Sequence, residues 1–212
     1  ALVATVCGFL TSILLLLVVL DWVWLTAKKR KKEFQVLART DSLTKIYNRY
    51  GFDESAEKMF SKNPQAHFVA ALLDIDDFKL INDLYGHHYG DSALKSLADS
   101  MKAFFPSDTL LGRNGGDEFC ILLPNCTVQE AEARLRQFTK LPKTFSYLGE
   151  ERTFYISLGY AEYPEFASNR SQLMRCADAA LYGIKLHGKN GCMAYRQGLQ
   201  SGVRKQLGFA FK

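Results

Sequence analysis

The hydrophobic pattern begins with an uninterrupted apolar run, since the first twenty residues carry no charged side chain. A helix of that length spans the ~30 Å hydrocarbon core of a bilayer. Asp21, Trp22, Trp24 and the basic stretch 28–32 (KKRKK) follow the run. A signal peptide would place its charge before a shorter apolar run. We therefore predict one transmembrane helix over residues 1–25, whose C-terminal end faces the cytoplasm because basic residues gather on that side.

The pattern after this segment predicts a helical linker and one mixed domain. Residues 26–40 place Phe34 and Leu37 on one helical stripe, which favours a basic juxtamembrane helix. From about residue 41 to residue 195, helical periodicity alternates with short extended runs. Extended runs outside repeated βαβ units predict an α+β domain with a mainly antiparallel sheet flanked by helices. Residues 196–212 form an amphipathic tail, which we interpret as a linker toward a further domain.

The periodicity also gives the individual elements. Helices are expected over residues 43–60, 78–85, 91–105, 128–140 and 170–188. Extended segments are expected over residues 68–76, 109–123, 143–163 and 192–195. Gly86 should end the second of these helices, and Asp91 stands where the N-cap of the third belongs.

The charge is concentrated in one segment. The formal net charge is +5, and the KKRKK stretch alone supplies five positive charges. The remaining 27 − 5 = 22 lysines and arginines balance the 22 acidic residues. The basic character is therefore a juxtamembrane feature that can attract anionic lipid. Nucleic-acid binding would need a basic face on the domain, and we expect no nucleic-acid partner.

Acidic side chains end the 68–76 strand. Asp74 and Asp76 are two residues apart and should share a face, while Asp77 points away. A strand that delivers carboxylates to its end can hold a hard divalent cation. A capping acid would explain one of these residues. Three acids in four positions repel one another, however, and this repulsion favours a compensating cation.

The stretch GRNGGDEFCILL, residues 112–123, predicts a hairpin, because Asn-Gly between apolar arms favours a tight turn. Gly115 and Gly116 carry no Cβ, so a ligand can approach the backbone there. Asp117 and Glu118 follow and, as neighbours in a strand, should point to opposite sides. We expect Asp117 to share a cation with Asp74, and Glu118 to face another group of the ligand.

The 78–85 helix divides its faces. Phe78 and Ile81 should face the core, and Lys79 and Asn82 should share a polar face. A lysine beside a metal-binding strand end can pair with phosphate oxygens as a point charge. A solvated lysine is the alternative interpretation.

Together these strings resemble one family. DSLTKIYNRYGF, LLDIDDFKLINDLYGHHYGD, GRNGGDEF, YISLGYA and ADAALYGIKLHGKN stand in the order and spacing of the GGDEF domain, the diguanylate cyclases. The resemblance covers about residues 41–195. It implies a fold similar to the palm of class III nucleotide cyclases and many polymerases. It also implies the condensation of two GTP to cyclic di-GMP with release of pyrophosphate.

The resemblance implies roles for single residues. Asp74 and Asp117 match the ligands of Mg²⁺ (or Mn²⁺), together with the carbonyl of Ile75. Glu118 matches the second signature acid near the reacting ribose, and Lys79 completes the catalytic set. The intact signature favours catalysis over the alternative from another class, a non-catalytic GGDEF module that binds GTP and regulates a neighbouring domain.

The remaining matches concern the substrate. The resemblance implies that Asn82 and Asp91 contact guanine. It implies that Lys185, Lys189 and the backbone amides around Phe78 contact the phosphates. Further contacts to GTP are implied for Gly115 and Gly116 at the hairpin tip. Lys189 stands where the family usually has arginine, so it keeps the charge but loses a bidentate geometry. A carboxylate such as Asp91 can accept from both donors on the Watson–Crick edge of guanine, whereas adenine offers an acceptor at N1.

The product joins two guanylates symmetrically, so two domains must face each other with one GTP each. We therefore expect a homodimer, located at the inner (cytoplasmic) membrane of a bacterium with its catalytic domain in the cytoplasm. Many family members also carry an Arg-x-x-Asp motif that grips the product and inhibits the enzyme. Here the matching positions are Pro106 and Thr109, which lack the charged groups for that grip.

Overall fold

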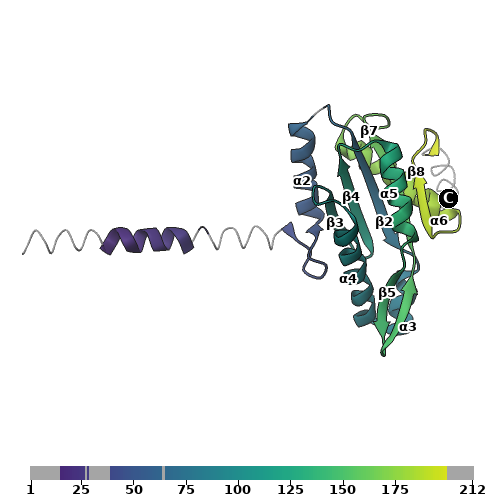
Figure 1. Ribbon diagram of the computed structural model, residues 1–212, viewed down its shortest axis with the longest axis horizontal. Coiled ribbons are helices and arrows are strands. Elements are labelled where there is room, and N and C mark those ends of the chain that lie inside the picture. The colour runs from purple at the N-terminus through teal and green to yellow at the C-terminus, as the bar shows by residue number, and fades with distance from the viewer. Residues whose placement is uncertain (1–14, 27, 29–38, 64, 200–212) are drawn as a thin grey trace, which may run out of the picture. The chain divides into compact units, whose positions relative to one another are not determined.

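The computed structural model describes residues 15–26, 28, 39–63 and 65–199 of the chain (Figure 1). Residues divide into two compact units, 1–38 and 39–212, which are described separately below. The second unit holds the mixed domain and all the predicted site residues.

In the first unit, residues 15–26 form a helix whose apolar side chains are exposed, with Leu15 at 70% and Trp22 at 66%. The Lys28 ammonium lies 4.7 Å from the centre of the Trp24 ring. Within the described residues, no helix reaches the length and apolar character that crossing a bilayer requires. Part of each prediction falls on residues outside the described part: residues 1–14 of the span 1–25, and residues 27 and 29–38 of the linker helix 26–40.

A six-stranded sheet forms the centre of the second unit, in the order β1-β3-β4-β2-β7-β8. The strands are β1 (Tyr47–Asn48), β2 (Phe68–Ile75), β3 (Leu110–Gly115), β4 (Glu118–Pro124), β7 (Ile156–Tyr163) and β8 (Gly191–Ala194). The three central pairs are antiparallel, as expected, whereas the short edge strands β1 and β8 are parallel to their neighbours. The sheet is therefore mixed. A separate two-stranded hairpin contains β5 (Lys143–Tyr147) and β6 (Glu150–Phe154).

Helices cover both faces of the sheet (Figure 1). They are α2 (Arg49–Lys62), α3 (Phe78–Tyr85), α4 (His87–Phe104), α5 (Val128–Lys140) and α6 (Arg170–Leu186). In β2, Val69 and Ala71 pack with α4 and α5, while Phe68 and Ala70 pack with α2 and α6. This alternation follows the two-residue repeat of a strand. The arrangement buries nearly the whole of β2, including Asp74 near its C-terminal end.

Two predicted helix starts are wrong, and both have a local cause. The first helix begins at Arg49 rather than at residue 43, because Asn48 caps it by accepting from the Gly51 amide. The third begins at His87, so Asp91 is not its N-cap and lies in its second turn. Gly86 alone separates α3 from α4, with φ of 90°, a conformation that glycine adopts without strain.

Candidate functional site

The acids of the signature meet at the C-terminal end of β2. The β2–β4 register places Glu118 directly opposite Asp74. Directly opposed residues of an antiparallel pair project from the same face, with Cβ atoms ~5 Å apart. Asp117 lies in the turn between β3 and β4 rather than in a strand, so the expectation that it and Glu118 are strand neighbours is wrong. The turn therefore holds Asp117, while β4 holds Glu118.

Asp74 is the most enclosed of these acids, with 7% of its surface exposed. Burial raises its pKa above the ordinary value, and the nearby charges of Asp117 and Glu118 raise it further. Lys185 of α6 opposes this shift, because its Nζ lies 2.7 Å from Asp74 Oδ2. The strand end thus carries a concentration of negative charge that one lysine partly balances.

The other two acids after β2 have partners of their own. Asp76 lies beyond the strand, and its carboxylate accepts from the Ser157 hydroxyl at 2.6 Å and from the Asn190 amide at 2.9 Å. Asp77 pairs with Lys189, whose Nζ is 2.6 Å from Oδ1. The repulsion expected among the three neighbouring acids is therefore reduced, because each acid has its own hydrogen-bond or ion-pair partner.

The start of α3 leaves its backbone donors available. Asp77 occupies the N-cap position with φ of 55° and makes no side-chain cap hydrogen bond. The first amides of a helix have no partner within the helix, and they attract anions. Lys79 follows on the exposed surface of the same turn. The start of α3 stands at the acidic strand end. Lys185 of α6 and Lys189 of the following loop stand there too.

The tip of the β3–β4 hairpin is open. Gly115 has φ of 142° and Gly116 has φ of 54°, and nothing lies within 4 Å of where a Cβ would stand on either. The predicted turn at Asn114–Gly115 is shifted, because both residues belong to β3 and the turn comprises Gly116 and Asp117. A ligand can approach this backbone closely, as the glycine pair suggests.

The Asn82 side chain of α3 reaches the helix that carries Asp91. A Cβ on Gly90 would stand 2.0 Å from Asn82 Oδ1 and 3.2 Å from the Phe78 ring. The Asn82 amide therefore lies against α4, directly beside the residue that precedes Asp91. Gly90 is needed for this approach, which explains the second glycine of GHHYGD.

Sequence reasoning missed Arg113. Its Nε and Nη2 donate to the Gly116 carbonyl at 2.9 and 2.7 Å, and its Nη1 donates to Asp41 Oδ1 at 3.1 Å. Asp41 also accepts from the amide and hydroxyl of Thr44. Burial raises the pKa of Asp41, but the bonds from Thr44 and Arg113 outweigh burial and hold it below the ordinary value. Arg113 thus connects the N-terminal end of the domain, at Asp41, to the tip of the β3–β4 hairpin at Gly116.

The side chains present fit a divalent cation in a limited way. Within the described part of the chain, no group of three or more His, Cys, Asp or Glu side chains stands ready to hold a metal. Asp117 nevertheless adjoins Glu118, which stands opposite Asp74 in the β2–β4 register, and this places Asp74 and Asp117 at the same strand end. Mg²⁺ is commonly held by one or two carboxylates together with substrate phosphates, so this pair fits Mg²⁺ with its substrate rather than a metal alone.

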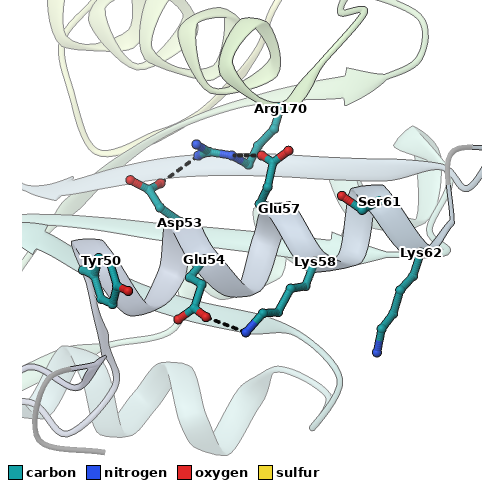
Figure 2. Close-up of a pocket in the computed structure, with 8 residues that line it drawn as sticks. All are labelled: Tyr50, Asp53, Glu54, Glu57, Lys58, Ser61, Lys62 and Arg170. Carbon is teal, nitrogen blue, oxygen red and sulfur yellow. Dashed lines mark hydrogen bonds and ion pairs between the residues drawn. The ribbon is translucent and has the colours of Figure 1, made fainter. Parts of the chain in front are cut away.

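A separate hollow lies along α2 (Figure 2). Most of its charged side chains pair with one another: Arg170 contacts Asp53 and Glu57, and Lys58 contacts Glu54. None of the predicted site residues lines this hollow. Arg170 instead joins the start of α6 to α2, which is a structural role.

Comparisons with known proteins agree with this geometry. Residues 38–191 match the diguanylate cyclase GGDEF domain family. The chain is 36% identical over 165 residues to the uncharacterized protein YhcK of Bacillus subtilis, covering 75% of this chain and 46% of that protein. It is 32% identical over 169 residues to a diguanylate cyclase of Vibrio cholerae, covering 79% of this chain and 53% of the other. The chain thus spans about half the length of these curated relatives.

A solved structure shows the same fold. The coiled coil and GGDEF domain of DgcB from Caulobacter crescentus, in complex with c-di-GMP, superimposes with a TM-score of 0.72 at 26% identity. The match covers 80% of this chain and 92% of that one.

Proposed function

The chain belongs to the GGDEF domain family, and from this premise we propose that it is a diguanylate cyclase that condenses two GTP to cyclic di-GMP and pyrophosphate. One observation carries the proposal: the register that sets Glu118 opposite Asp74, with Asp117 in the adjoining turn. A purely structural hairpin would gain nothing from placing Asp117 and Glu118 where their charges raise the pKa of Asp74. Acids gathered in this way at a strand end are typical of a site that binds cations and phosphates.

In this proposal, Asp74, Asp117 and the Ile75 carbonyl would hold Mg²⁺ or Mn²⁺. The bound ion would supply charge neutralisation on the triphosphate. Lys185 would exchange its pairing with Asp74 for a phosphate oxygen, and Lys189 would do the same from Asp77. Each lysine already lies at an acid of the strand end, so little movement is required. Lys79 and the first amides of α3 would contact the remaining phosphate oxygens.

Two residues would select and activate the nucleotide. Asp91 would accept from guanine N1–H and the N2 amino group, with Asn82 beside it. Glu118, exposed at the start of β4, would face the 3′-hydroxyl of the reacting ribose and take up its proton. The reaction then proceeds by attack of that oxygen on the α-phosphorus of the second GTP, with pyrophosphate as the leaving group.

The assembly is part of the proposal. One domain binds one GTP, so catalysis requires a homodimer with two sites face to face. Residues 1–25 would tether the protein to the inner (cytoplasmic) membrane of a bacterium and leave the domain in the cytoplasm. The exposed apolar side chains of residues 15–25 support a nonpolar environment for that segment.

The alternative is a non-catalytic module that binds GTP and regulates a neighbouring domain. A product assay separates the two functions. The full 212-residue chain, purified in detergent, is incubated with GTP and Mg²⁺, and the products are identified by mass spectrometry. We expect cyclic di-GMP and two equivalents of pyrophosphate, with normal turnover in the control Asp99→Ala on the exposed surface of α4. GTP binding without product would support the regulatory module instead.

A further inference from the structure

Tyr147, near the tip of the β5–β6 hairpin, packs against both helices that carry the proposed guanine contacts. Its ring centre lies 4.8 Å from that of Tyr85 on α3 and 4.6 Å from that of Tyr89 on α4. The interplanar angles are 62° and 70°, so both contacts are edge-on. Aromatic pairs in this geometry are favourable beyond the area that they bury. One side chain therefore joins two helices.

The hairpin that carries Tyr147 is anchored firmly at its base. Phe145 and Phe154 are each 4% exposed, and Phe145 also packs edge-on against Tyr85 at 5.5 Å. At the first residue of β5, the Lys143 ammonium donates to the Leu141 carbonyl at 2.7 Å and to the Phe138 carbonyl. These bonds satisfy carbonyls at the end of α5. The hairpin is thus fixed to α5 at one end and to the α3–α4 junction at the other.

The junction that receives Tyr147 is held by side-chain packing: besides the tyrosine contacts, Asn82 and Phe78 lie against Gly90. Gly86 alone connects α3 to α4, and it has the widest conformational freedom of any residue. Tyr85 immediately precedes this glycine, and Tyr89 stands one turn after it. Asn82 lies one turn before Tyr85, and Asp91 lies two residues after Tyr89. A change in the angle between the helices would therefore alter the separation of Asn82 and Asp91.

We propose that Tyr147 is a positioning residue for guanine recognition, which fixes the angle between α3 and α4 and thereby the spacing of Asn82 and Asp91. This inference rests on the proposed function, because it assigns guanine to these two side chains. Tyr147 itself does not contact the nucleotide. It acts through Tyr85 and Tyr89, so its loss should reduce the discrimination between bases rather than the binding of phosphates.

The test compares two nucleotides that differ only at the group concerned. GTP presents N1–H and an N2 amino group, whereas ITP lacks the amino group. Their 3′-deoxy forms cannot attack the second nucleotide, so binding is measured without turnover. The full chain is titrated calorimetrically with 3′-deoxy-GTP and 3′-deoxy-ITP in the presence of Mg²⁺. The measured quantity is the dissociation constant of 3′-deoxy-ITP divided by that of 3′-deoxy-GTP. This ratio does not depend on the fraction of folded protein.

Tyr147→Ala should lower the preference for 3′-deoxy-GTP by roughly three- to tenfold, within the range that a loosened polar contact produces. Tyr147→Phe keeps the ring and should restore the wild-type ratio. Leu148→Ala is the matched control, because Leu148 lies on the same hairpin and is 77% exposed. If Tyr147→Ala does not fold, Tyr147→Leu retains most of the apolar volume and is measured in the same way.

The outcomes separate the inference from the function on which it rests. A wild-type protein that does not prefer the guanine nucleotide would overturn the assignment of Asn82 and Asp91 to the base. A wild-type preference that persists unchanged in Tyr147→Ala, or in Tyr147→Leu, would overturn the positioning role alone. A fall in the ratio that Tyr147→Phe reverses would support both.

Discussion

The acidic strand end and the α3–α4 junction are held in place by different forces. Backbone pairing in the centre of the sheet fixes Asp74 and Glu118, because the β2–β4 ladder is continuous up to that pair. Side-chain packing fixes Asn82 and Asp91, through Gly90 and the tyrosines around Tyr147. The hydrogen-bond register of two paired strands cannot change gradually, whereas side-chain packing between helices can relax in small steps. Substitutions at the strand end should therefore act through lost charge, and those at the junction through altered geometry.

The largest effect is expected at the acids. Asp117→Ala or Glu118→Ala should abolish cyclic di-GMP formation, a loss on the order of a thousandfold or more, since charge that stabilises a transition state is removed. The fold should remain, because Asp117 lies in a turn and Glu118 is exposed. Product formation and the thermal unfolding temperature are measured together. Full turnover in either variant would reject the catalytic assignment.

The base site should respond in a smaller and more selective way. Asp91→Asn leaves one acceptor where the carboxylate has two, so GTP affinity should weaken by about 1–3 kcal/mol. Asp91 is exposed in the second turn of α4 and does not cap that helix. Helix stability should therefore stay unchanged, and a titration with GTP and ATP measures the loss of preference. Equal affinity of the variant and the wild type for GTP would remove Asp91 from the binding site.

Substitution of Arg113 tests whether side-chain contacts, in addition to backbone pairing, fix the geometry of the acidic strand end. Arg113→Lys keeps the charge, but a single ammonium cannot bond Gly116 and Asp41 with the fork that the guanidinium provides. We expect turnover to fall about tenfold, equivalent to ~1.4 kcal/mol, while KM for GTP changes little. Arg136→Lys on α5 is the matched control, because Arg136 pairs with Glu132 on the exposed surface of the same helix. A change confined to KM would place Arg113 with substrate binding instead.

The sequence predicted the strand end better than its surroundings, for a physical reason. The apolar run of β2, the Gly-Gly pair and the acids are all local features, and so is the helical periodicity of α5. Contacts between distant segments leave no local pattern. The bond from Ser157 to Asp76 joins residues 81 apart, and that from Lys189 to Asp77 joins residues 112 apart. The shifted start of α4 has a local cause instead, because the helix begins at His87 directly after Gly86 and Asp91 then falls in its second turn.

The β5–β6 hairpin, which we propose to support guanine recognition, has a titratable anchor. Burial lowers the pKa of Lys143 to about 8 from an ordinary value near 10.5. The unfolded chain therefore binds more protons above pH 8, so stability should rise with pH through this group, by about 1 kcal/mol between pH 7.5 and 9. The contribution is lost as pH falls through 8. Unfolding of wild type and Lys143→Met is followed across this range, and parallel pH profiles would contradict the assignment.

The smallest expected effect concerns the product. Pro106 and Thr109 occupy the positions at which related domains carry an arginine and an aspartate for product binding. Thr109 is 8% exposed, and its hydroxyl has no hydrogen-bond partner within the described residues, so it is unavailable to a ligand on the surface. Asp108 lies one place away and is exposed in a turn, which the Thr109 amide closes by donating to the Pro106 carbonyl at 3.0 Å. The structure thus corrects the expectation of an extended segment here, and Asp108 does not occupy the place of the residue at 109. We therefore expect that cyclic di-GMP at about 1 μM changes the rate of GTP turnover very little. This concentration corresponds to ordinary binding energies of about −8 kcal/mol.

The rate is measured at saturating GTP, so that competition at the active site does not contribute, and with Asp108→Ala alongside. Strong inhibition that this substitution relieves would show that Asp108 takes over the missing contact.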